Sequence, residues 1–161
     1  MNKILADMHT HTIASGHAYA TLTEMCKEAA NKGLEIYGIT EHSSGIPGTC
    51  ADLYFKNLGV VPRDLFGLDL RLGAEINIID YNGTLDLGQE YIDRLDFVIA
   101  GIHSVCYKFG SKEENTAAII NAIKNPNVNI ISHPDDGRCP LDYEALIQAA
   151  KEYHVLLEIN N

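Results

Sequence analysis

The sequence has few basic residues and no long apolar run, and both shortages exclude classes of protein. Twelve Lys and Arg residues stand against 22 Asp and Glu, a formal net charge of −10. Nucleic-acid backbones are bound by clustered basic side chains, so a nucleic-acid partner is not expected. No stretch approaches the ~20 apolar residues of a membrane span, and Asp7 interrupts the apolar run that a signal peptide would continue. We therefore expect no membrane partner and a cytoplasmic location.

Cysteine is also sparse. The chain has four cysteines, and no two of them form a C-x-x-C pair. Neither a thiolate zinc ribbon nor a dithiol redox motif is therefore indicated. Free thiols in a reducing compartment are the simplest interpretation.

The apolar residues that are present indicate an α/β protein. With 161 residues and 46% apolar composition, the chain is long enough for one domain. Short apolar runs alternate with helical patterns, which is typical of βα units around a parallel sheet or barrel. The runs are Ile4 to Met8, Leu34 to Thr40, Leu70 to Ile79, Asp96 to Ile102, Val128 to Ser132 and Val155 to Ile159.

Three helices can be placed by their caps and apolar stripes. Thr21 and Glu24 have capping-box spacing, and Gly33 supplies a C-terminal stop. A second apolar stripe runs through Ile119, Ile120 and Ile123, and Asp142 is a suitable N-cap for a third helix. These helices are expected to cover the sheet.

Two segments between these elements are harder to interpret. Residues 76–81 and 84–87 flank Asn82-Gly83 and predict a hairpin with a tight primed turn. Residues 43–68 contain two prolines and several glycines, and we expect a long loop with room for one helical turn. Such a loop at the end of a strand can line an active site.

Histidine carries the main functional signal. Six of the seven histidines lie at or just beyond the C-terminal end of an apolar run, where the strands of an α/β barrel meet at one mouth. Residues two apart on a strand point to the same face, so His9 and His11 can converge on one ion. Glu75 puts a carboxylate inside the third run, where an unpaired charge would be costly. The predicted ligands are His9, His11, His17, His42, Glu75, His103 and His133.

This ligand set indicates more than one metal ion. Imidazole and carboxylate suit zinc, manganese or iron, and seven ligands exceed the need of one tetrahedral ion, so two or three ions are expected. A single histidine at a strand end is more often an ordinary core or loop residue, but six arranged alike are not independent. His154, on the last helix, is instead expected to be a surface or packing residue. At Glu41 and Glu158 a supporting hydrogen bond or salt bridge competes with direct ligation.

The ordered motifs resemble those of the PHP (polymerase and histidinol phosphatase) superfamily. The matching segments are Asp7-Met8-His9-Thr10-His11, Ala14 to Tyr19 with His17, Ile39-Thr40-Glu41-His42, Gly73 to Asn77, Ala100 to His103, Ile131 to Pro134 and Leu157 to Asn161. The likeness covers nearly the whole chain and is greatest to the small stand-alone bacterial phosphatases of that superfamily.

The resemblance implies a fold, a metal centre and a reaction. The fold would be a distorted TIM-like barrel of seven βα units, here with about six, over a single PHP domain at residues 1–161. His9 and His11 would hold one zinc or manganese ion, Glu75 would bridge it to a second ion on His103 and His133, and His17 with His42 would hold a third. A hydroxide on this cluster would hydrolyse a small phosphomonoester, with Glu75, His103 and His133 as the catalytic residues.

The chain departs from the family pattern at its end. The final Asp-x-His motif of the family does not follow Asn161, so the first and third ion sites would each lack a ligand, and the domain is expected to be C-terminally truncated. An open sheet has unpaired edges, which favour association with a second copy. A metal-binding PHP fragment without turnover is therefore a second hypothesis. A nuclease or proofreading phosphodiesterase is a third, and the shortage of basic residues counts against it.

Overall fold

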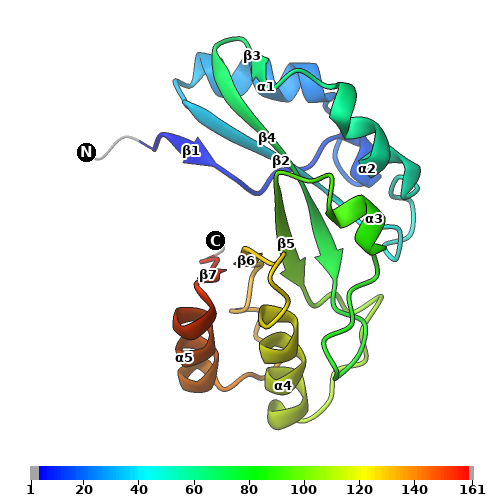
Figure 1. Cartoon of the computed structure of the whole chain (residues 1–161), viewed down its shortest axis with the longest axis vertical. Coiled ribbons are helices and arrows are strands. Elements are labelled where there is room, and N and C mark those ends of the chain that lie inside the picture. The colour runs from blue at the N-terminus through cyan, green and yellow to red at the C-terminus, as the bar shows by residue number, and fades with distance from the viewer. Residues whose placement is uncertain (1–3, 160–161) are drawn as a thin grey trace.

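Six parallel strands form a curled, open sheet. The computed structural model describes residues 4–159, and the sheet order is β1-β2-β4-β5-β6-β7, with β3 antiparallel to β4. The strands are β1 (Ala6–Asp7), β2 (Ile36–His42), β3 (Asp64–Leu65), β4 (Leu68–Asn77), β5 (Phe97–Gly101), β6 (Ile130–Ile131) and β7 (Leu156–Leu157). The sheet bends into a half-barrel (Figure 1), which confirms the predicted α/β fold with six parallel strands. Within residues 4–159, β1 and β7 do not pair with each other.

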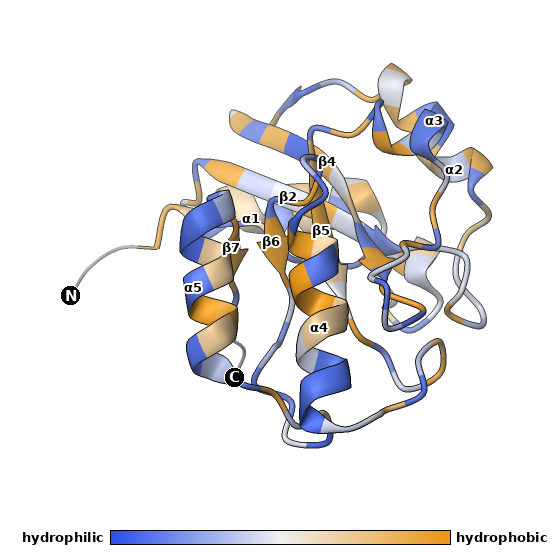
Figure 2. Cartoon of the chain, turned by 60° about the horizontal axis from the view of Figure 1, so that its bottom comes forward, coloured by the Kyte–Doolittle hydropathy of each residue, from blue (hydrophilic) through white to orange (hydrophobic). Residues whose placement is uncertain are grey.

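Helices cover the outside of this sheet. They are α1 (Leu22–Asn31), α2 (Leu53–Asn57), α3 (Gln89–Ile92), α4 (Lys112–Ile123) and α5 (Tyr143–Tyr153). α4 and α5 pack side by side, and both carry hydrophobic and hydrophilic residues (Figure 2). In residues 4–159 no helix is long and apolar enough to cross a bilayer.

The predicted helix signals act as expected. Thr21 and Glu24 form a complete capping box on α1, and Asp142 accepts a hydrogen bond from Ala145 N at the start of α5. A second capping box, between Ser111 and Glu114, begins α4. These contacts satisfy backbone N–H groups that have no partner inside the helix.

The core lies between the central strands and the helices. Leu70, Leu72, Ile76 and Ile99 are fully buried on β4 and β5, and burial of apolar surface at roughly 25 cal/mol per Å² is the main favourable contribution to folding. Gly38 lets β1 approach β2 closely, because a Cβ atom there would lie 2.7 Å from Met8 Cα. The strand that leads to His9 is thereby held against the sheet.

Two sequence predictions need correction. The hairpin pairs through Ile78 and Leu85, but only Gly83 of the Asn82-Gly83 pair has a positive φ, so the predicted primed turn is wrong. The loop is wider because the Asp80 carboxylate accepts hydrogen bonds from the backbone N–H groups of Asn82 and Thr84. Residues 43–68 hold α2, the 3-10 turn η2 (Leu58–Val60) and β3, which is more structure than the single helical turn expected.

Candidate metal centre

Five histidines surround the carboxylate of Glu75. Oε2 of Glu75 lies 3.1 Å from His9 Nε2, 3.2 Å from His11 Nε2 and 3.1 Å from His42 Nδ1. Oε1 lies 3.1 Å from His103 Nε2 and 2.9 Å from His133 Nε2. Glu75 is 1% exposed, so a carboxylate at the centre of the sheet meets imidazoles from both sides.

The parallel register produces this convergence. His42 is directly opposite Glu75 in the β2–β4 pair, and Ile99 is opposite Glu75 in the β4–β5 pair. His103 follows the end of β5 and His133 follows the end of β6. His133 has a φ of 30°, which is uncommon for a residue with a side chain. Strained backbone of this kind occurs often at functional sites.

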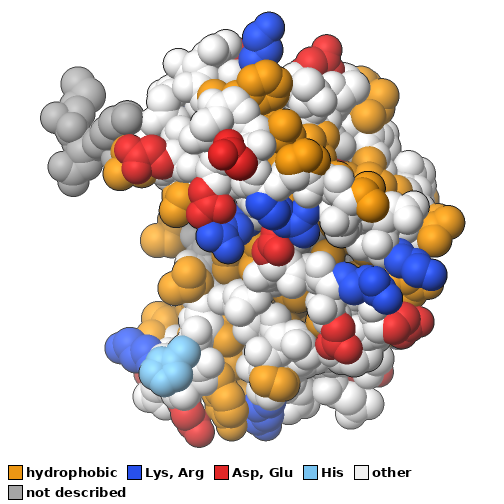
Figure 3. Space-filling view, turned by 45° about the horizontal axis from the view of Figure 1, so that its top comes forward, with side chains coloured by type: hydrophobic (Ala, Val, Ile, Leu, Met, Phe, Trp, Pro, Cys, Tyr) orange, Lys and Arg blue, Asp and Glu red, His pale blue; other side chains and the backbone are white. Residues whose placement is uncertain are grey.

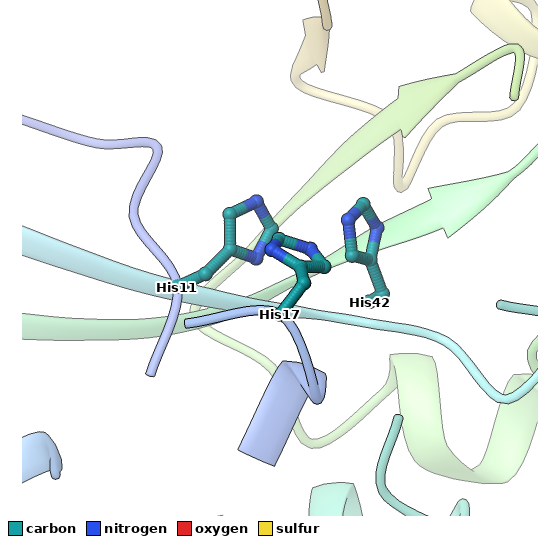
Figure 4. Close-up of side chains that lie close together, drawn as sticks. All are labelled: His11, His17 and His42. Carbon is teal, nitrogen blue, oxygen red and sulfur yellow. The ribbon is translucent and has the colours of Figure 1, made fainter. Parts of the chain in front are cut away.

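His17 joins the group from a loop. It follows the 3-10 turn η1 (Ile13–Ser15) and is exposed, whereas His42 is buried. Figure 4 shows His17 beside His11 and His42, and the ligand atoms of the three lie within 4.8 Å of one another. All seven residues predicted from the sequence therefore gather at one end of the sheet.

Three overlapping groups have the spacing of a metal site. They are His11, His17 and His42; His9, His11 and Glu75; and His42, Glu75 and His103. Glu75 belongs to two groups, as a bridging carboxylate would. His133 lies outside these three groups, although its Nε2 reaches Oε1 of Glu75.

The electrostatics of the cluster favour bound positive charge. Burial alone would raise the pKa of Glu75, but hydrogen bonds from His103, His11, His133 and His9 hold that pKa well below its usual range. Burial acts against protonation of His9, yet its contacts with Glu75 raise its pKa to about 9. Without metal, the charge of Glu75 is thus balanced by protonated imidazole.

His42 supplies a separate indication of a cation. Burial, together with neighbouring histidines, lowers its pKa to about 3, so the ring is neutral. Its Nδ1 is buried and has no hydrogen-bond partner in the described part of the chain, although Oε2 of Glu75 is 3.1 Å away. A nitrogen lone pair beside a carboxylate oxygen fits a divalent ion between them.

Supporting side chains hold the second ring nitrogen of three histidines. His9 Nδ1 is 2.9 Å from Glu158 Oε1, His11 Nδ1 is 3.0 Å from Ser15 Oγ, and His103 Nδ1 is 2.7 Å from Asn77 Oδ1. Such contacts fix the tautomer and orientation of metal-binding imidazoles.

The two flanking glutamates have different surroundings. Glu41 is fully buried, accepts hydrogen bonds from Thr12 and Ser15, and belongs to none of the three groups with the spacing of a metal site. Glu158 also accepts a hydrogen bond from His133 N at 2.8 Å. Sequence patterns do not point to Ser15 or Asn77 as supporting residues; the only signal is that each lies two residues from a predicted ligand.

Open cavities lie above the cluster. One of about 310 Å³ is lined by the five histidines around Glu75 and by Glu158. A neighbouring cavity of about 490 Å³ shares His103 and His133 with it and adds Val105, Asp135 and Arg138. Arg138 pairs with Asp136 at 2.7 Å. A substrate larger than phosphate can therefore lie beside the histidines.

Two further basic side chains and the seventh histidine lie away from the cluster. Arg63 pairs with Asp96 and with backbone carbonyls, and Lys108 lines a separate cavity with Tyr81. His154 is the exposed C-cap of α5.

Comparison with known proteins identifies the family of the chain. The family model for the PHP domain matches residues 7–161. A protein of Acetivibrio thermocellus named "Probable phosphatase" is 48% identical over 159 residues, covering 99% of this chain and 66% of the relative. A "Probable phosphatase" of Caldicellulosiruptor saccharolyticus is 51% identical over 155 residues, covering 96% of this chain and 65% of the relative. The chain thus spans slightly less than two thirds of the length of these curated relatives.

A solved structure has the same fold. The histidinol phosphate phosphatase of Lactococcus lactis subsp. lactis, crystallised with zinc, L-histidinol and phosphate, superposes with a TM-score of 0.56. The identity is 17%, and the match covers 96% of this chain and 72% of that protein. The fold and the histidine-rich strand ends define an α/β half-barrel protein with a candidate metal centre. The chain belongs to the PHP domain family.

Proposed function

We propose that this chain is a metal-dependent phosphoesterase that hydrolyses small phosphomonoesters. The observation that carries the proposal is the contact of five histidines, from four strand ends, with both oxygens of one buried glutamate. The names of the relatives and the phosphate in the Lactococcus lactis structure support the same reaction class.

The ligand roles proposed for the residues follow the geometry. His9, His11 and Glu75 would hold one ion, and His103 and His133 would hold a second on the other oxygen of Glu75. His17 would complete a third site with His42. Two or three zinc ions are proposed, and manganese or iron suits the same ligands. Ions bound there would lower the pKa of a water molecule and neutralise phosphate charge.

The protein's own side chains would orient the ester. Glu75, His103 and His133 form the catalytic group of this proposal because the two histidines line both cavities and contact the same oxygen of Glu75. Arg138, at the edge of the neighbouring cavity, would attract the anionic substrate. A small phosphorylated metabolite in the cytoplasm is the substrate class that we propose.

The exposed charges favour a small substrate over a nucleic acid. On the face shown in Figure 3, Lys and Arg side chains lie in small groups beside Asp and Glu, without a continuous basic strip. The formal charge of −10 also disfavours a nucleic-acid substrate, because its phosphate backbone is negatively charged.

The test is hydrolysis of p-nitrophenyl phosphate by protein loaded with Zn²⁺ or Mn²⁺. Chelator treatment and a His9→Ala substitution should both abolish turnover, whereas His154→Ala, which removes an exposed histidine, should retain it. Tight binding of metal without turnover would instead support the metal-binding fragment. Turnover that survives both chelation and His9→Ala would contradict the proposal.

A further inference from the structure

His103 contacts the side-chain amide of Asn77, and this amide in turn contacts the carboxylate of Asp86. Asn77 is the last residue of β4 and is fully buried, and its Oδ1 lies 2.7 Å from His103 Nδ1. Asp86 lies on the segment that returns along the end of β4, where its backbone N–H donates to Asn77 O at 3.1 Å. Its carboxylate thus lies behind the amide that contacts the histidine.

The surroundings of Asn77 allow only one orientation of its amide. Nδ2 of Asn77 lies 2.6 Å from Asp86 Oδ2 and 2.9 Å from Ser43 Oγ. A carboxylate only accepts hydrogen bonds, and the Ser43 hydroxyl already donates to Asp86 Oδ1 at 2.5 Å. The reversed amide would place Oδ1 of Asn77 against a carboxylate oxygen, which is repulsive.

This orientation determines which nitrogen of His103 carries the hydrogen. Oδ1 of Asn77 can only accept, so His103 Nδ1 must donate. Nε2, which faces Glu75 Oε1 at 3.1 Å, is then the nitrogen that can bind a cation once it gives up its hydrogen bond to that oxygen.

The loop that follows β2 holds the carboxylate in place. Gly45 N donates to Asp86 Oδ2 at 3.1 Å. A Cβ atom at Gly45 would lie 2.3 Å from that same oxygen, so only glycine leaves room for the contact. Asp86 therefore has a fixed position rather than a variable surface conformation.

We propose that Asp86 is a positioning residue, which orients the Asn77 amide so that His103 keeps its hydrogen on Nδ1 and presents Nε2 to metal. This inference rests on the metal centre of the proposed function. The test is Asp86→Asn, which keeps the shape but supplies an NH2 group. Asn77 can then reverse and donate to His103 Nδ1, which moves the hydrogen of His103 to Nε2.

The readout is the ¹⁵N spectrum of the His103 ring in metal-free protein. Wild-type protein should show a protonated Nδ1, and Asp86→Asn should show an unprotonated Nδ1. Zn²⁺ affinity, measured by competition with a chelator, should fall by roughly 10- to 100-fold, the usual effect of losing a supporting contact. Asp64→Asn removes the same charge from exposed β3 and should change neither measurement.

A double variant separates this positioning role from a general loss of structure. In Asn77→Asp/Asp86→Asn, the carboxylate at position 77 can accept from both His103 and the new amide, at unchanged net charge. Protonation of Nδ1 and Zn²⁺ affinity should return. An unprotonated Nδ1 in the wild-type protein, or unchanged Zn²⁺ affinity in folded Asp86→Asn, would overturn the proposal. Because the ring spectrum requires no turnover, it stays informative even if no phosphoesterase activity is found.

Discussion

The centre of the site depends on the charge of one residue, Glu75. Its two oxygens contact five histidines, and burial makes an uncompensated change there costly. Glu75→Gln keeps the size but removes the negative charge that would bridge two ions. We expect turnover and Zn²⁺ affinity to fall by more than about 100-fold, since supporting residues alone contribute 10- to 100-fold.

Glu152→Gln is a matched control for this substitution. Glu152 is exposed on α5 and lies outside the predicted ligand set. Glu152→Gln should retain both the turnover and the Zn²⁺ affinity of the wild-type protein. A Glu75→Gln variant that binds two ions with unchanged affinity would remove the bridging role.

Metal uptake at neutral pH should release protons. The contacts with Glu75 raise the pKa of His9 to about 9 in the metal-free protein, so this imidazole is largely protonated near pH 7. Metal binds the neutral ring, so each binding event must displace that proton, and affinity should increase as pH rises toward 9. Calorimetry in buffers of different ionisation enthalpy measures the release; heats independent of the buffer would contradict it.

At this scale the sequence predicts candidate ligands but not their supporting contacts. The strand-end positions of His9, His103 and the others follow from two local patterns, apolar runs and residue type. The link from Asp86 to Asn77 joins residues whose approach depends on the wider turn at Asp80, and no local pattern shows that turn. The orientation of an amide likewise depends on neighbours that only the folded chain supplies.

At the scale of single elements, the N-cap of α1 should contribute measurably to stability. Thr21 accepts a hydrogen bond from Glu24 N and is exposed. Thr21→Ala should lower the free energy of unfolding by about 1 kcal/mol. Thr23→Ala, an exposed position inside the same helix, should cost little, because alanine is the better helix former there. Urea unfolding compares the two, and equal losses would refute the cap's role.

The approach of β1 to β2 gives a second prediction for an element. A Cβ at Gly38 would lie 2.7 Å from the backbone of Met8, so Gly38→Ala should push away the strand that leads to His9. We expect a loss of roughly 1–3 kcal/mol in stability, the usual range for overpacking, together with weaker Zn²⁺ binding. Gly59→Ala, which has no atom within 4 Å of the added Cβ, should have little effect in the same urea and metal titrations.

Elements were predictable where a local pattern is strong. The capped helices and the six parallel strands follow from periodicity and end signals, although β1, β6 and β7 are only two residues long in the structure. β3 was missed because its two residues pair through a turn with a positive φ at Phe66, which residue type does not suggest. Strand and turn types there are decided by tertiary contacts with β4.

At the scale of the whole molecule, metal should stabilise the fold. The candidate ligands come from strands that are distant in the sequence, so an unfolded chain cannot present them together. Free Zn²⁺ at 100 times its dissociation constant should add about 2.7 kcal/mol to the free energy of unfolding. Thermal unfolding with and without chelator measures the gain, and Glu75→Gln should abolish it. An unchanged melting temperature in the wild-type protein would contradict tight binding to the native state.

The open sheet gives a prediction about assembly. β1 and β7 end the strand order without pairing with each other in residues 4–159, and Leu156 on β7 is 67% exposed. Unpaired strand edges favour association, so we expect self-association in solution. Light scattering measures it, and a monodisperse monomer across the accessible concentration range would contradict it.

Because residues from several strands meet at Glu75, metal binding there depends on the register of those strands. Side chains alternate between the two faces of a sheet, so a one-residue slip of β5 would turn His103 away from Glu75. The proposed second ion would then lose a ligand, although the apolar strand could still be buried by a different pairing. Metal added during refolding should consequently favour chains whose strands pair in the native register. The fraction of protein with bound metal then reports the fraction of chains with a correctly paired sheet.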